Sequence, residues 1–531
     1  MDRVDVVVIG SGAAGVAVSW RLASRGARVV CLEQGDWAKP EEFPSTRPLV
    51  EAEILRGRFN TSPNVRRRLE DYPVLSDSSG VAITMFNGVG GSTVHWEGHF
   101  PRFHPSDFRV RSLDAVSDDW PIRYEDLAPY YDENDRMTGV SGISGDPANP
   151  PRSERPMPPL PLGRRGEVAV RGFEKLGWHW WPSDNAIASR DYDGRKGCDF
   201  RGFCNFGCIR RAKSSVDVTY WPKAMAAGAI LQTWARVRAI TVDGQGRARG
   251  ALYFDRQGAQ HEQLGRVIVV CCNGVGTPRL LLNSKSKLFP EGLANSNGLV
   301  GKNLMLHPGM TVEGIFDEPV DGHVGTTGNP LFSQQFYETD LSRGFVRGYM
   351  MVLYGPRGLL QQVTRRIKEP LAWGADHHRQ MRREFGHSLR ITIEAEDLPE
   401  GTNLVQLDRG LKDSNGIPAA RVVYEYSENT LKMLQHGVSM ASQVLDAAGA
   451  VQIRASESPR HFAHLMGTAR MGSDPKRSVV NAWNQAHDVP SLFIVDGSSF
   501  TTCAAVNPTS TIGALALRAA DGIWERRRDW N

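Results

Sequence analysis

The N-terminal stretch has the most regular pattern of apolar and polar positions in the chain. Residues 6–9 form a continuous apolar run, which is typical of a buried parallel strand. Residues 16–25 then carry apolar side chains at helical spacing, and the apolar run at 28–33 predicts a second strand. The pattern therefore predicts a strand–helix–strand unit.

A glycine-rich turn joins the first predicted strand to the predicted helix. Its residues are Gly10, Ser11, Gly12, Ala13, Ala14 and Gly15. Glycines allow a tight turn and close backbone approach to a pyrophosphate, which the helix N-terminus faces. Glu33, at the end of the second strand, can accept hydrogen bonds from ribose hydroxyls and favours a ribose without a 2′-phosphate. The unit predicts a site for FAD or NAD, and a glycine-rich turn of another α/β protein is the alternative.

Apolar runs farther along the chain predict a continuation of the first sheet. Runs at 247–254 and 266–272 precede a glycine-rich turn at 273–278 and a Leu-rich helix. The nucleotide-binding domain is therefore expected to be discontinuous and Rossmann-like, an α/β domain in a chain that is α+β overall. We predict that it comprises residues 1–106, 191–309 and 456–531.

Residues 310–455 have a different pattern, in which strand-like runs alternate with helical stretches. The strand-like runs are 345–354, 388–396, 403–407 and 420–426. With a helix over 430–448, they predict an antiparallel sheet covered by helices. Together with residues 107–190, which include the Pro-rich connecting segment 147–161, this stretch predicts a substrate-binding domain.

Composition and charge exclude several classes of protein. At 531 residues and 40% hydrophobic content, the chain can bury a large core. Its formal net charge of +4 and the lack of a basic stripe argue against nucleic-acid binding. No apolar run is long enough to cross a bilayer. The first strand begins by about residue 4, which leaves no room for a signal peptide, so we expect a cytoplasmic protein unless a partner subunit exports it.

A second glycine-rich loop occupies residues 87–98. Asn87-Gly-Val-Gly-Gly91-Ser92 places three glycines next to small hydroxyl residues, and His95 follows. Such a backbone can lie flat against a planar ligand or its phosphates. After a dinucleotide motif, it predicts that the bound nucleotide carries a second large, flat group.

Two polar turns near the C-terminus supply candidate catalytic groups. His464 opens the segment His-Leu-Met-Gly-Thr-Ala-Arg-Met-Gly, and Asn507 opens Asn-Pro-Thr-Ser-Thr. Oxidising an alcohol requires a base that takes the hydroxyl proton and a donor that fixes the oxygen. Neutral imidazole suits the first role and a side-chain amide the second. Taken alone, His464 also fits a satisfied interior histidine.

These motifs together resemble the glucose-methanol-choline (GMC) flavoprotein oxidoreductases over essentially the whole chain. The matching blocks are 10–15 with Glu33, 87–98, 274–282, 301–308 and the C-terminal pair of motifs, in family order. Within the family, the chain looks most like bacterial pyranose oxidases and the large subunits of gluconate, fructose and glucose dehydrogenases. The resemblance implies FAD rather than NAD as the cofactor.

The resemblance also implies roles for individual residues. His464 matches the active-site histidine of the family, and Asn507 matches the second catalytic position. The predicted cofactor-binding residues are Gly10, Gly12, Ala13, Ala14, Gly15, Glu33, Asn87, Gly91, Ser92, His95, Val237, Asp496, Gly497, Asn507, Pro508 and Thr509. His95 matches the histidine that bonds covalently to FAD in fungal pyranose oxidases, and bacterial relatives need not form that bond.

Three of the seven cysteines lie in one loop. Cys198, Cys204 and Cys208 can ligate a [3Fe-4S] cluster or supply three ligands to zinc. The loop resembles the cluster-binding loop of glucose and fructose dehydrogenase large subunits, but Asp199 and Ile209 depart from that pattern. The alternative is a loop of free cysteines without metal. A cluster implies electron transfer to a partner cytochrome subunit, whereas its absence leaves oxygen or a quinone as acceptor.

Three functions therefore compete. The leading hypothesis is FAD-dependent oxidation of a hydroxyl of a sugar, glycoside, sugar acid or polyol to a carbonyl, with hydride transfer to flavin N5 and His464 as base. The second is the catalytic subunit of a flavin and iron–sulfur dehydrogenase complex. The third is a non-redox protein of the same fold, which the intact motifs at His464 and Asn507 argue against.

Overall fold

The computed structural model of the protein describes residues 2–43, 72–76, 81–359, 372–459 and 464–530. At its N-terminus, β1 (Val4–Ile9), α1 (Ala13–Ala23) and β2 (Val29–Leu32) form the predicted strand–helix–strand unit. β1 and β2 pair in parallel. All residues of β2 and the last four of β1 are buried, which explains their continuous apolar sequence.

A seven-stranded sheet is built around this unit. Its strand order is β5-β2-β1-β8-β7-β6, and β16 pairs with β8. The added strands are β5 (Ile230–Gln232), β6 (Arg236–Val242), β7 (Ala248–Phe254), β8 (Gln260–Val270) and β16 (Leu492–Ile494). β6, β7 and β8 are antiparallel, and the other pairings are parallel. The predicted continuation of the first sheet is therefore confirmed.

Helices pack beside this sheet. α12 (Thr509–Glu525) packs against α1 and α4 (Tyr124–Thr138), and α7 (Trp221–Ala226) also packs against α1. α8 (Asn273–Asn283) begins earlier than predicted. The stretch expected as a turn is its first turn, because the Asn273 side chain accepts hydrogen bonds from the amides of Val275 and Gly276.

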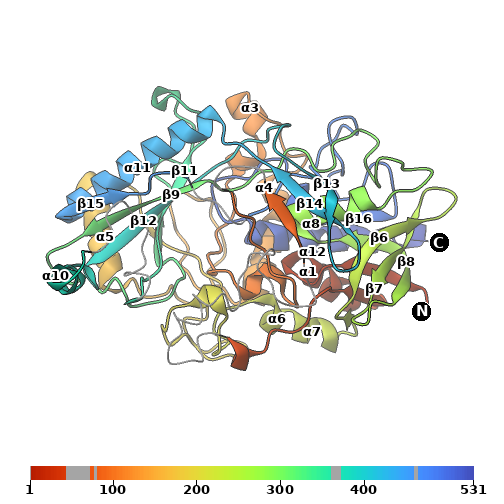
Figure 1. The fold of residues 1–531 in the computed structure, drawn as a ribbon, viewed down its shortest axis with the longest axis horizontal. Coiled ribbons are helices and arrows are strands. Elements are labelled where there is room, and N and C mark those ends of the chain that lie inside the picture. The colour runs from red at the N-terminus through yellow and green to blue at the C-terminus, as the bar shows by residue number, and fades with distance from the viewer. Residues whose placement is uncertain (1, 44–71, 77–80, 360–371, 460–463, 531) are drawn as a thin grey trace.

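A six-stranded antiparallel sheet forms the other half, with order β15-β9-β12-β11-β10-β4. Its strands are β4 (Trp181–Pro182), β9 (Gly309–Ile315), β10 (Leu331–Ser333), β11 (Tyr349–Leu353), β12 (Ser388–Ala395) and β15 (Gln452–Ala455). α11 (Glu428–Ala448) packs against the sheet and against α5 (Gly163–Leu176). In Figure 1 these two helices lie at the opposite end of the long axis from β6, β7, β8 and both chain ends.

Two of the predicted strands do not belong to this sheet. β13 (Leu404–Lys412) and β14 (Pro418–Val423) pair with each other, and β14 pairs in parallel with β3 (Val74–Ser76). The expectation of one antiparallel sheet over 310–455 is therefore wrong. The three-stranded sheet packs on α8 because its apolar residues share a core with Val275 and Leu465.

Residues 107–190 also divide between the two halves. Leu127 and Tyr131 of α4 are fully buried, and α4 packs against α12, so α4 lies with the half built on the seven-stranded sheet rather than with the predicted substrate domain. The Pro-rich segment 147–161 contains neither a helix nor a strand. The remaining α-helices among the described residues are α3 (Val110–Asp114), α6 (Val216–Thr219) and α10 (Ala375–Glu384). Short 3₁₀ helices lie at Pro40–Glu42, Gly91–Val94, Pro105–Phe108, Cys204–Phe206, Leu341–Arg343, Gly497–Ser499 and Arg527–Trp530.

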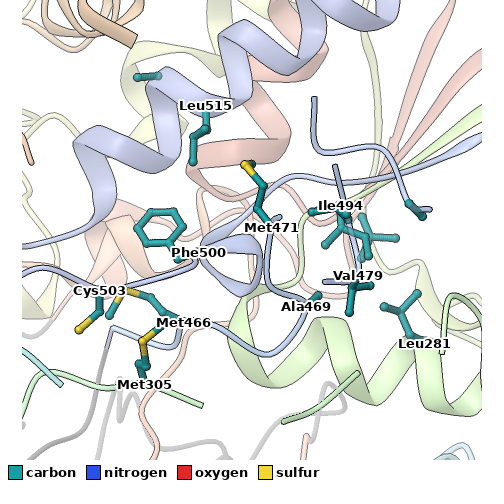
Figure 2. Packing of buried hydrophobic residues seen from close by; sticks show 14 of the residues in the cluster. Leu281, Met305, Met466, Ala469, Met471, Val479, Ile494, Phe500, Cys503 and Leu515 are labelled. Atoms are coloured by element: carbon teal, nitrogen blue, oxygen red, sulfur yellow. The ribbon is translucent and has the colours of Figure 1, made fainter. Parts of the chain in front are cut away.

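Buried apolar side chains support the C-terminal motif segment. Figure 2 shows Leu515 of α12 pointing towards Met471 and Phe500, while Met305 and Met466 lie beside each other below them. All five side chains are buried. The backbone that follows His464 is therefore held by dense packing.

Parts of the predicted domains lie outside the described residues. They include residues 44–71, 77–80 and 460–463 of the predicted nucleotide-binding domain and residues 360–371 of the predicted substrate-binding domain. Among the helices that are described, none is long and apolar enough to cross a membrane.

Candidate active site

A cavity of about 730 Å³ is lined by residues of both halves of the molecule. The predicted site residues that line it are Gly10, Gly12, Ala13, Ala14, Glu33, Asn87, Gly91, Ser92, His95, Val237, His464, Asp496, Gly497, Asn507, Pro508 and Thr509. Gly15, Cys198, Cys204 and Cys208 are not part of the lining. The two ends of the sequence and both glycine-rich loops therefore meet at one cavity.

The first glycine-rich turn is packed too closely for side chains. A Cβ atom on Gly10 would lie 2.4 Å from the Cys271 carbonyl oxygen, and Gly10 has a φ of +98°. A Cβ atom on Gly15 would lie 1.9 Å from the Gly10 carbonyl oxygen, so Gly15 acts through packing rather than by lining the cavity. Within the described chain no side chain caps α1, and its amide groups remain suited to a phosphate.

Two carboxylates brace the turns that line the cavity. Glu33 accepts hydrogen bonds from the amide (3.1 Å) and hydroxyl (2.7 Å) of Ser11, so it holds the first glycine-rich turn against the end of β2. Asp496 accepts from the Asn273 amide at 3.0 Å and from the Thr277 hydroxyl at 2.6 Å. Burial raises the pKa of Asp496 above its usual value. Both carboxylates line the cavity while they fix its backbone.

His464 and Asn507 are the centre of a chain of four hydrogen-bonded side chains. The Asn507 amide nitrogen lies 3.3 Å from Nε2 of His464, and the other ring nitrogen, Nδ1, lies 2.8 Å from Nδ1 of His307. On the far side, Oδ1 of Asn507 lies 2.7 Å from Nδ1 of His99. The sequence motifs predict the central pair but neither of the outer histidines.

The donors and acceptors of these hydrogen bonds can be assigned from His307. Nε2 of His307 lies 2.9 Å from the Ala504 carbonyl oxygen and 3.2 Å from that of Cys503, so this nitrogen must donate. A neutral His307 then accepts at Nδ1, and His464 donates from its own Nδ1. Nε2 of a neutral His464 is therefore the acceptor, and it faces the Asn507 amide.

Burial keeps the outer histidines neutral. It lowers the pKa of His307 to about 4, although the two carbonyl contacts oppose the change. It also lowers the pKa of His99 to about 4, against the opposing effect of its bond to Asn507. Because neither ring is charged near neutral pH, each keeps one donor and one acceptor nitrogen, and the hydrogen-bond direction is maintained.

His95 is held by the cysteine-containing loop. Its Nδ1 lies 3.1 Å from the Asn205 carbonyl oxygen, and its ring packs edge-on against Phe86 with 4.5 Å between ring centroids. The buried Lys213 ammonium donates to the carbonyl oxygens of Val94 at 2.7 Å and Cys204 at 2.5 Å, which ties this loop to the second glycine-rich loop. Covalent attachment of FAD at His95 stays a prediction.

The predicted iron–sulfur ligands are free thiols. No group of three or more His, Cys, Asp or Glu side chains among the described residues could hold a metal ion. Cys204 is buried with Leu160 and Ile187, and Cys198 packs against them. Burial raises the pKa of Cys198 to about 12, which disfavours the thiolate that a metal requires. The described residues therefore give the iron–sulfur cluster no support, and it stays a prediction; the Asn205 carbonyl of this loop contacts His95.

Sequence reasoning also missed two carboxyl groups in the cavity wall. Glu97 lies in the second glycine-rich loop. Glu394 lies on β12 two residues after Thr392, and both of these side chains line the cavity. Burial raises the pKa of Glu97 to about 7, and burial together with Glu97 raises that of Glu394 to about 8. The signal was present in the sequence, because residues 390–394 alternate polar and apolar side chains.

Comparisons with known proteins agree with this architecture. Two family models, both described as GMC oxidoreductase, match residues 4–309 and 399–516. The chain belongs to the GMC oxidoreductase family. The resemblance inferred from the sequence motifs is thereby confirmed, and the protein is an oxidoreductase.

Similar curated proteins span nearly the whole of this GMC oxidoreductase. A 2-methyl-1,2-propanediol dehydrogenase of Mycolicibacterium austroafricanum is 45% identical, over 99% of this chain and 96% of its own length. The fructose dehydrogenase large subunit of Gluconobacter japonicus is 28% identical, over 98% and 97%. Paromamine 6′-oxidase of Streptomyces fradiae is 30% identical, over 98% and 92%.

Solved structures share the fold. Pyridoxine 4-oxidase from Mesorbium loti superimposes with a TM-score of 0.64 at 16% identity, covering 98% of this chain and 99% of its own. An Aspergillus oryzae formate oxidase variant, described for its FAD modification, superimposes with a TM-score of 0.66 at 14% identity, covering 100% and 99%. The predicted α/β class with a Rossmann-like half is confirmed.

Proposed function

We propose that this GMC oxidoreductase uses FAD to oxidise a hydroxyl group of a sugar, glycoside, sugar acid or polyol to a carbonyl. The observation that carries the proposal is the acceptor nitrogen Nε2 of His464, which lines the same cavity as the uncapped N-terminus of α1 and both glycine-rich loops. A base and a nucleotide site thus share one enclosed space.

The lining fits FAD. Gly10 and Gly12 of the first glycine-rich turn line the cavity without side chains, and Gly91 approaches Gly12 so closely that its own Cβ would lie 3.0 Å from the Gly12 Cα. Gly497, Pro508 and Thr509 would hold the ring end, where α12 begins without a side-chain cap in the described chain. When bound, FAD supplies the hydride acceptor, N5 of its ring.

His464 and Asn507 act on the substrate hydroxyl. His464 takes the hydroxyl proton at Nε2, while its Nδ1–H remains bonded to His307. The Asn507 amide, held by His99 at its oxygen, donates a hydrogen bond to the substrate oxygen. The electron pair of the neighbouring C–H bond leaves with the hydrogen as hydride, and the carbon–oxygen double bond forms.

Relatives support a polyhydroxylated substrate. The names of the three curated relatives refer to a diol, a ketohexose and an amino sugar derivative. All three substrates carry a hydroxyl next to further polar groups. Oxygen, a quinone and a cytochrome subunit stay predictions as electron acceptors.

Replacement of His464 tests the proposal. We expect His464→Ala to retain flavin absorbance but to slow anaerobic flavin bleaching by an active alcohol roughly 100-fold or more, since general-base catalysis is worth about that much. Stopped-flow absorbance at the flavin band, over a panel of diols, sugars and sugar acids, measures both properties. Bleaching of the variant at the wild-type rate would show that His464 is not the base.

A further inference from the structure

The cavity wall contains hydrogen-bond acceptors that the described residues leave unused. Nε2 of His99 and Oε2 of Glu394 have no partner among the described residues, and both side chains line the cavity. His99 is 3% exposed. A buried acceptor without a donor is costly, so both atoms indicate a bound group that donates hydrogen bonds.

Backbone pairing places these acceptors beside the catalytic pair. Glu394 pairs with Gly309 on β9, and the Ala395 amide donates to the Pro308 carbonyl at 2.9 Å, directly after His307. On the other side, Glu97 lies two residues before His99, which bonds to Asn507. Each carboxyl group therefore flanks one of the histidines that hold His464 and Asn507.

Glu97 and Glu394 form no ion pair with a described Lys or Arg, although Arg390, Lys213 and Arg165 act on Glu97 from a distance and lower its pKa. Glu97 accepts a hydrogen bond from the Tyr354 hydroxyl at 2.9 Å. The nearby guanidinium groups are used elsewhere: Arg390 donates to the Gly355 carbonyl and Arg165 to the Tyr354 and Thr326 carbonyls.

We propose that Glu394, Glu97 and His99 form a subsite for a second hydroxyl group of the substrate, next to the hydroxyl that is oxidised. This inference rests on the proposed function and narrows it to vicinal diols and polyols. Carboxylate-bearing substrates such as sugar acids are excluded, because neither the carboxyl groups nor the neutral His99 ring offers a positive charge to pair with a buried carboxylate.

The raised pKa values of Glu97 and Glu394 favour a neutral hydroxyl over an ammonium group as the bound group. Burial raises the pKa of Glu97 to about 7 and of Glu394 to about 8, with Glu97 raising the latter further. Near neutral pH the pair therefore retains a proton and carries little negative charge. A hydroxyl can bond to either form of a carboxyl group, whereas an ammonium group requires the ionised form.

Matched small alcohols test the subsite in the holoenzyme. We expect kcat/KM for propane-1,2-diol to exceed that for propan-1-ol roughly 10- to 100-fold, the worth of a buried hydrogen bond in discrimination. Glu394→Met should lower the ratio of kcat/KM for propane-1,2-diol to that for propan-1-ol to about 1, whereas Glu394→Gln, which keeps an acceptor, should retain most of the wild-type ratio. The exposed Glu318→Gln is the control, and circular dichroism and flavin content verify folding.

Several outcomes would overturn the subsite. Equal use of propane-1,2-diol and propan-1-ol by the wild type would do so, and so would an equal loss for both in Glu394→Met. Better use of 2-aminopropan-1-ol than of the diol would make it a cation site instead, and good use of glycerate would contradict the exclusion of acids. If no alcohol bleaches the flavin, the proposed function is wrong, and the subsite, which rests on it, is wrong too.

Discussion

At the scale of single residues, His307 decides what His464 can do. Its Nε2 faces two carbonyl oxygens and can only donate, so its Nδ1 must accept from His464. The tautomer of the proposed base is thus set by a residue that the hydroxyl need not touch. The other ring nitrogen of His464, Nε2, faces the amide nitrogen of Asn507, which can donate to it.

Replacing His307 should change the pH dependence of flavin reduction. We expect His307→Leu to slow reduction about 10- to 100-fold, because an unsatisfied buried donor costs roughly 1–3 kcal/mol. The acid limb of the pH–rate profile should also move to lower pH, since a protonated His464 would lose its acceptor. Stopped-flow reduction between pH 5 and pH 9 measures both effects.

The conservative variant separates this positioning role from packing. His307→Asn places an amide oxygen near the original Nδ1, so it should restore much of the rate and the profile of the wild type. A rate loss in both variants with an unchanged profile would show that His307 only fills space.

At this scale the sequence predicted the central pair and not its supports. His464 and Asn507 stand in recognisable turns, and both reach the cavity. His99 and His307 come from other loops, and their partners lie 408 and 157 residues away in the chain. Local patterns carry no information about such long-range contacts, so single histidines beside known motifs could not be assigned roles.

At the scale of elements, the first glycine-rich turn shows how backbone geometry makes a nucleotide site. Gly10 takes a positive φ at the end of β1, where the chain passes the Cys271 carbonyl of the neighbouring strand end. The turn directs the uncapped amides of α1 into the cavity lining. Both the conformation and the contact exclude a side chain there.

A pair of glycine variants separates these two effects. Gly26 has a φ of +91°, close to that of Gly10, but its added Cβ would meet no atom within 4 Å. Gly26→Ala should therefore cost only about 1–2 kcal/mol of backbone strain, whereas Gly10→Ala should also lose most bound flavin. Thermal melting and the ratio of flavin to protein absorbance measure the difference. Equal flavin content in the two variants would contradict a role for Gly10 in the site.

Element type was easier to predict than sheet membership. The apolar pattern predicts strands at 403–407 and 420–426, and the structure has strands at 404–412 and 418–423. They pair with each other, and the second also pairs with β3, rather than with β12. Alternation shows that a strand has one buried face and does not show which sheet it joins. The partner β3 has three residues, too few for a recognisable pattern.

At the scale of the whole molecule, buried acidic groups join segments of both halves. Asp397, just after β12, accepts hydrogen bonds from the Tyr424 hydroxyl at 2.7 Å and the Leu306 amide at 3.2 Å. Its other oxygen lies 3.4 Å from the Thr430 hydroxyl at the start of α11. This one carboxyl group thus connects the six-stranded sheet, the end of β14 and the segment leading to His307.

Asp397 should make the protein less stable as the pH rises. Burial raises its pKa to about 7 from the ordinary value of 3.8, and the hydrogen bonds oppose that change only in part. The folded protein therefore holds a proton that the unfolded chain releases. The corresponding stability is fully present below about pH 4 and is lost as the pH rises through about 7, on the order of a few kcal/mol in total.

The isosteric variant Asp397→Asn cannot ionise and should lose this pH dependence. We expect the melting temperature of the wild type to fall more than that of the variant between pH 5 and pH 8, so that the variant gains relative stability at the higher pH. Thermal melts followed by circular dichroism, with flavin content matched, measure the two slopes. Because Asp397 lies outside the cavity lining, bound substrate should not alter the comparison. Parallel slopes for the two proteins would show that Asp397 is ionised in the folded state at neutral pH.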